Sequence, residues 1–143
     1  MLRGLNKILL LTGVTIILDL TLLNRTASVR SDVLSLPFQL IHSALFVRRE
    51  TIRSLLLNIL LFTPFGAALP HLLPPSKSIW KRVLLTGVAA MLFSIVIEIC
   101  QYVFSLGNAE ADDVICNTLG ALIGALSLPL SVYLSKRKRP YSE

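Results

Sequence analysis

Four long apolar runs limit the possible folds of this chain more than any other feature of its sequence. They occupy residues 5–23, 54–73, 83–104 and 114–134. At 1.5 Å of rise per residue, about 20 apolar residues cross a hydrocarbon core of about 30 Å. Because lipid offers no hydrogen bonds, each run must satisfy its own backbone as a helix. The sequence therefore predicts an all-α membrane protein with four transmembrane helices.

The composition agrees with a membrane protein, since 54% of the residues are hydrophobic and only 15% are charged. We expect one transmembrane helical domain over residues 1–134 and a basic cytoplasmic tail over residues 135–143. A cleaved signal peptide is the alternative for residues 5–23, but that run is long and carries Asp19. The net charge of +6 comes mostly from residues beside the apolar runs, so the expected partners are membrane lipids and not nucleic acid.

A fifth apolar segment, residues 33–47, has only 15 residues and is interrupted by Pro37. It is too short to span a membrane easily. We expect an amphipathic segment lying on the membrane, or a re-entrant one, in the first outer loop.

Polar residues interrupt the third and fourth runs with helical spacing. Ser94, Glu98 and Gln101 share one face of a helix, and Asp113 and Asn117 share a face of the next. An acidic residue at the centre of a membrane helix costs about 2.5 to 3.5 kcal/mol, so it normally faces a partner, a cavity or a substrate. Glu98 therefore marks a candidate site.

The helix directions predict that several polar residues share one depth. Asp19, Asn58, Glu98, Gln101 and Asn117 all fall within about 10 Å of the outer end of their run. The shared depth of these five residues predicts one outward-facing polar pocket. The alternative is a purely structural cluster, in which Glu98 pairs with a first-loop arginine and Gln101 bonds Asn117; such interhelical bonds average about 0.6 kcal/mol.

Other residues are expected to shape helix packing, because proline removes a backbone donor and the GxxxG spacing favours close approach. These are Pro64, Gly66, Gly120 and Gly124. Asp112 with Asp113 is a weak metal candidate, since hard cations need several oxygen ligands. We therefore expect no metal site and no cofactor.

Three motifs in order resemble the VanZ-like family of small bacterial membrane proteins. They are NILLFTPFG at residues 58–66, IEICQ at 97–101 and DDVICNTLGALIG at 112–124, and the resemblance covers about residues 33–124. The family often has an arginine shortly before its paired aspartates, whereas this chain has SLGNAEADD.

The resemblance implies a multi-pass protein of the bacterial plasma membrane that contributes to resistance to glycopeptides such as teicoplanin. We expect the pocket to bind a cell-envelope ligand, either a lipid-linked envelope precursor or the glycopeptide itself. The alternative is an intramembrane enzyme acting on such a precursor, with Glu98 and Asp113 as its acid–base pair. The candidate ligand-binding residues are Asn58, Glu98, Gln101, Asp112, Asp113 and Asn117.

Basic residues predict that both termini are cytoplasmic. Nine lie on the side of the termini (Arg3, Lys7, Lys77, Lys81, Arg82 and the four of residues 136–139) and five arginines lie in the first loop. In a variant without Cys100 and Cys116, an impermeant thiol reagent outside the cell should label a cysteine at position 108 and not one at position 77. Labelling at 77 alone would contradict this orientation.

Overall fold

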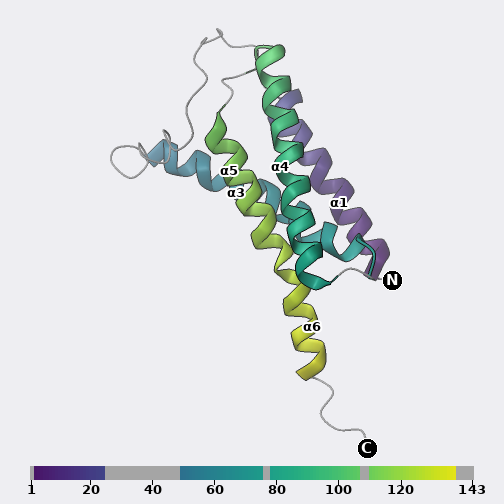
Figure 1. Ribbon diagram of the computed structural model, residues 1–143. Coiled ribbons are helices and arrows are strands. Elements are labelled where there is room, and N and C mark those ends of the chain that lie inside the picture. The colour runs from purple at the N-terminus through teal and green to yellow at the C-terminus, as the bar shows by residue number, and fades with distance from the viewer. Residues whose placement is uncertain (1, 25–48, 76–77, 107–109, 138–143) are drawn as a thin grey trace, which may run out of the picture.

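The computed structural model describes residues 2–24, 49–75, 78–106 and 110–137, and it is helical (Figure 1). The elements are α1 (Leu2–Leu18), the π-helical η1 (Asp19–Leu23), α3 (Arg49–Leu72), α4 (Ile79–Val103), α5 (Ala111–Ala125) and α6 (Ser127–Arg137). Four stretches are long and apolar enough to cross a membrane: Arg3–Leu23, Ile52–Leu72, Ile79–Val103 and Ala111–Ser135. The predicted all-α fold with four transmembrane helices is confirmed. The segment expected to lie on or re-enter the membrane, residues 33–47, is outside the described residues.

The fourth span differs from its prediction at both ends of α5. Asp112 and Asp113, which precede the predicted fourth run of residues 114–134, form the first turn of α5, where negative charge is favourable near the positive end of the helix dipole. The expected single helix is divided at Leu126 into α5 and α6. Pro129 explains the break, because it cannot donate a backbone hydrogen bond to Ala125. Figure 1 shows α6 continuing beyond the other helices.

The core of the bundle is built around α3, which packs against α1, α4 and α5. Its buried Phe62 and Phe65 meet Phe93 of α4 with ring centroids 5.9 Å apart in both pairs. Ile17, Ile97 and Ala121 complete this core from α1, α4 and α5. In a membrane the hydrophobic effect does not drive helices together, because lipid tails are as apolar as the side chains. Close packing of this kind drives the helices to associate instead.

Glycines bring α3 and α5 into backbone contact. A Cβ atom on Gly120 would overlap the carbonyl group of Ile59, and one on Gly124 would overlap that of Thr63. From the other side, a Cβ on Gly66 would overlap the backbone of Ala121. The two helices can therefore approach this closely only because these positions carry no side chain.

Arg82 joins α4 to α3 at the end of the bundle that contains the N-terminus. Pro74 has no N–H group, so the carbonyl of Pro70 lacks its ordinary helical donor. Arg82 of α4 replaces it, since its Nε atom donates to the Pro70 carbonyl at 2.7 Å. Nearby, the Ser127 hydroxyl donates to the Ala67 carbonyl at 3.3 Å. The contacts at this end stabilise helix termini, whereas the polar side chains from the third and fourth runs gather at the other end.

Replacing Gly120 by alanine should lower the stability of the bundle, because the new methyl group must push apart the backbones of α3 and α5. Overpacking of this kind typically costs about 1 to 3 kcal/mol. The measurement is unfolding of purified protein in detergent. Gly4→Ala is the matched control, since nothing lies within 4 Å of a Cβ at Gly4. Equal stability of the two variants would show that α3 and α5 do not pack at Gly120.

Candidate functional site

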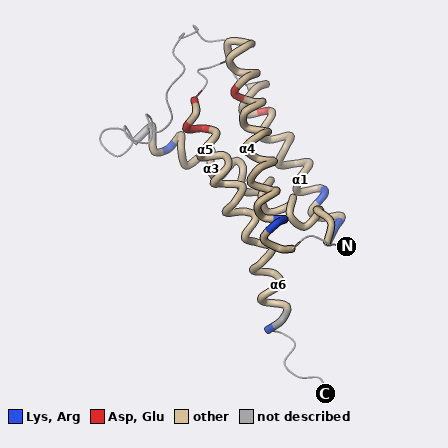
Figure 2. The backbone as a smooth tube through the Cα atoms, in the orientation of Figure 1, with Lys and Arg blue, Asp and Glu red and all other residues tan. Residues whose placement is uncertain are grey.

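The candidate site lies at the acidic end of the bundle, where η1 and α4 end and α3 and α5 begin. Figure 2 shows the acidic residues gathered at this end, whereas basic residues mark the N-terminal end of α1, the start of α4 and the end of α6. A further basic position lies near the start of α3. All four spanning segments thus bring polar groups to one level, and four hydrogen bonds described below join them.

The first of these bonds ties α4 to the end of the first span. The π-helical turn closes with the Asn24 amide donating to the Asp19 carbonyl at 2.8 Å. Thr21 lies within that last turn, where helical carbonyls lose their partners. The Gln101 side-chain amide donates to the Thr21 carbonyl at 3.0 Å. Gln101 therefore supplies a donor to a carbonyl in the last turn of the first span.

The second bond joins the first half of α3 to the first turn of α5. The Asn58 side-chain amide donates to an oxygen of the Asp113 carboxylate, and both side chains are partly buried. Beside them, the Asp112 side chain is fully buried at 0% exposure. Gly120, two turns after Asp113, touches the backbone of Ile59, the residue after Asn58, so the packing of α3 against α5 holds Asn58 near Asp113. Two residues from different sequence motifs therefore form one contact.

The third bond closes the turn between α4 and α5. At the end of α4, Ser105 adopts a positive φ of 53° and the Leu106 amide donates to the Gln101 carbonyl at 2.9 Å. After the turn, the Glu110 backbone amide donates to the Glu98 carboxylate at 2.9 Å. Glu98 is only 8% exposed. A buried carboxylate thus accepts a backbone donor at the entrance to α5.

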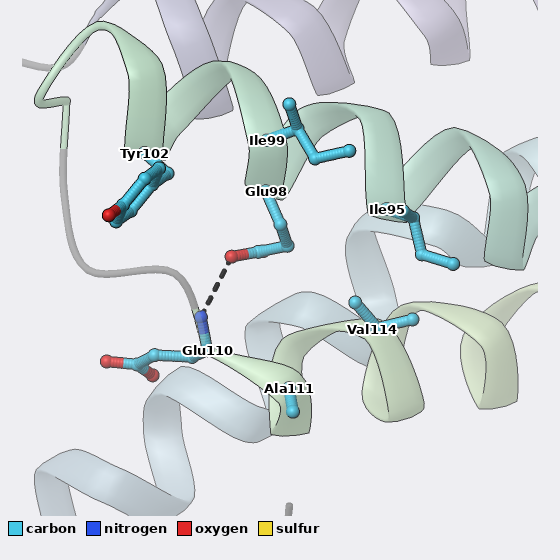
Figure 3. A pocket seen from close by; sticks show the side chains of 7 residues that line it. All are labelled: Ile95, Glu98, Ile99, Tyr102, Glu110, Ala111 and Val114. Atoms are coloured by element: carbon cyan, nitrogen blue, oxygen red, sulfur yellow. Dashed lines mark hydrogen bonds between the residues drawn. The ribbon is translucent and has the colours of Figure 1, made fainter. Parts of the chain in front are cut away.

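A cleft of about 260 Å³ lies beside this bond, between α4 and α5. Figure 3 shows its lining, with Ile95, Ile99 and Val114 along the walls and Glu98, Glu110 and Tyr102 toward the turn. The surface that the cleft presents is almost entirely apolar, so it suits an apolar part of a bound molecule.

The fourth bond lies deeper, where the Asn117 side-chain amide donates to the Ser94 hydroxyl at 2.8 Å. The amide oxygens of Asn117 and Gln101 are buried, and neither has a hydrogen-bond partner among the described residues. The two side chains are 3% and 1% exposed. Two acceptors with no donor among the described residues therefore point to a donor that comes from outside this part of the chain.

The structure thus places all six candidate ligand-binding residues at one end, but it distributes them over different partners. The pairing of Gln101 with Asn117 that the structural alternative invoked is wrong, because Gln101 bonds Thr21 and Asn117 bonds Ser94. Asp19 shares the level but its side chain is exposed. Glu98 and Asp113 accept from Glu110 and Asn58, respectively.

Sequence reasoning missed three contributors to this end: Thr21, Tyr102 and Glu110. Thr21 acts through its carbonyl and Glu110 through its amide, so their side-chain types gave no signal. Tyr102 follows Gln101 directly and could have been noticed as an aromatic residue near the end of a span. Among the described residues, no three His, Cys, Asp or Glu side chains gather closely enough to hold a metal ion.

Comparison with known proteins gives one match. A family model described as VanZ/LLP1 matches residues 8–132, which is most of the chain. Neither the curated proteins nor the solved structures include a match.

Proposed function

Because the chain belongs to the VanZ/LLP1 family, we propose that it contributes to glycopeptide resistance, as the resemblance implies, by binding a cell-envelope ligand at its acidic end. The ligand is a lipid-linked envelope precursor or a glycopeptide such as teicoplanin. The protein lies in the bacterial plasma membrane with both termini cytoplasmic, so the acidic end faces outward. The distribution of basic residues supports this orientation.

The observation that carries the proposal is the pair of buried amide oxygens on Gln101 and Asn117. A buried acceptor without a donor costs about 1 to 3 kcal/mol. Interiors rarely keep such groups unless water or a ligand completes them. A hydroxyl or amide of a ligand would supply the missing donors, and both sugars and peptides are rich in these groups.

The carboxylates add a second requirement. Glu98 is buried beside a cleft, and Asp112 is fully buried at the start of α5. Carboxylate oxygens accept hydrogen bonds, so Glu98 beside the cleft favours a ligand that presents donors. Hydrogen bonds to charged groups contribute about 1.5 to 3 kcal/mol each, which is enough to select such a ligand.

The intramembrane enzyme is the alternative function. It is favoured by one observation, namely that the Glu98 carboxylate, Glu110 and Tyr102 line the same cleft. Groups of this kind can transfer protons when a substrate places its reacting atom within about 3 Å of them. Turnover of a lipid-linked precursor by the purified protein would favour the enzyme, and binding without turnover would favour the accessory role.

Glu98→Gln should abolish the protection that the protein gives a susceptible bacterial host against teicoplanin. Glutamine keeps the shape of the side chain and an acceptor for the Glu110 amide, but it removes the charge. A contact needed only for structure should therefore survive the change, whereas a ligand-binding or acid–base carboxylate should not. The measurement is the inhibitory concentration of teicoplanin in cells with equal membrane levels of each variant. Asp113→Asn and Asn117→Ala should behave like Glu98→Gln.

Asp19→Asn is the matched control, because Asp19 is an acidic residue at the same end whose side chain is exposed. It should protect like the unaltered protein. Full protection by Glu98→Gln at equal membrane levels would make Glu98 a structural residue and would remove the central residue of the proposed pocket.

A further inference from the structure

A second and larger hollow, of about 560 Å³, runs between α1 and α3. We call it the α1–α3 groove. Most of its lining is apolar, including Leu9, Ile16, Leu20, Leu57 and Leu60. Leu57 and Leu60 are 53% and 64% exposed, so the groove opens at the surface of a helix that spans the membrane. Its occupant must therefore be apolar along most of its length.

The groove is polar mainly at one end. Asn58, in the first half of α3, and Thr21, near the end of the first span, line this end, and Thr12 adds one hydroxyl further along. The Asn58 amide also donates to Asp113, so this end of the groove is continuous with the acidic end of the bundle. An asymmetric lining of this kind matches an amphiphile whose polar part lies at the acidic end.

The length of the groove fits one leaflet of a bilayer. From Leu9 to Thr21 the first span advances 12 residues, which is about 18 Å at 1.5 Å per residue. Half of a hydrocarbon core is about 15 Å. A single hydrocarbon chain anchored at the outer surface would therefore reach from the polar end of the groove to about its far end.

We propose that the α1–α3 groove seats one hydrocarbon chain of a membrane lipid, with a hydroxyl-bearing head group at Asn58. A hydroxyl both donates and accepts, so it pairs with either half of the Asn58 amide. The proposal rests on the proposed function, since Asn58 belongs to that site, and it names the ligand class as a lipid that enters sideways from the outer leaflet.

Gly13 lines the groove and gives a way to block it. A Cβ atom on Gly13 would lie 3.5 Å from the Phe65 backbone nitrogen and 3.7 Å from the Pro64 side chain, which is ordinary contact. Alanine therefore fits without moving α1 from α3. A leucine at this position adds three further carbon atoms beside the groove that Gly13 lines, so it leaves less room for the chain of a lipid.

The test uses the full chain in nanodiscs that contain phosphatidylglycerol with a photoactivatable diazirine on one acyl chain. After illumination, peptide mass spectrometry should find labels on groove residues in severalfold excess over Leu84 and Leu92, which are exposed on α4 at 64% and 55%. Diazirines near the chain end should label Leu9, and those near the head group should label Leu20 or Leu57.

Gly13→Ala should keep this excess, whereas Gly13→Leu should lose it with the labelling of α4 unchanged. Equal labelling of the groove and α4, or an excess that survives Gly13→Leu, would show that only bulk lipid fills the groove and would overturn the proposal. Teicoplanin protection is read separately. If Glu98→Gln loses protection but the lipid labels the protein uniformly, the lipid site in the groove is refuted and the proposed function stands. If the groove is labelled specifically but Glu98→Gln protects fully, the proposed function is refuted and the lipid site stands.

Discussion

The close approach of α3 and α5 is the constraint on which the rest of this structure depends. Gly120 and Gly124 place the backbone of α5 against the carbonyls of Ile59 and Thr63, and no larger residue fits there. Backbones that are this close gain dispersion contacts, and lipid cannot replace those contacts as well. The same contact fixes where the start of each helix lies, and it therefore holds Asn58 against Asp113. The packing of α3 against α5 at these glycines therefore also brings together the polar side chains at the acidic end.

The polar end follows from a second constraint, the cost of unpaired groups in hydrocarbon. Each of the four spans ends or begins at this level, and side chains replace the backbone partners that helix ends lack. Gln101 caps the first span, and Glu98 receives the amide at the start of α5. These bonds use the amide nitrogen of Gln101 and one carboxylate oxygen of Glu98. The amide oxygens of Gln101 and Asn117 have no hydrogen-bond partner among the described residues.

The fold could be predicted well from the sequence, because the length of an apolar run and the helix rise determine which segments can span a membrane. That Asn58, Glu98, Gln101 and Asn117 lie toward the same end of the bundle could be predicted for the same reason. Their partners could not, since the pairing depends on helix rotation and on backbone groups that carry no residue signature. Gln101 bonds a carbonyl of the first span rather than Asn117. The π-helical turn also depends on packing that periodicity does not encode, whereas the division of the last span at Leu126 follows from Pro129.

The central claim is that the unpaired amide oxygens of Gln101 and Asn117 receive donors from a bound ligand. An experimental structure of the protein purified in native membrane nanodiscs tests it most directly. The account predicts non-protein density larger than a water, with atoms within about 2.7 to 3.2 Å of each oxygen, which is the ordinary range of hydrogen bonds. Donors supplied to both oxygens by the protein's own side chains, or by ordered water alone, would contradict it.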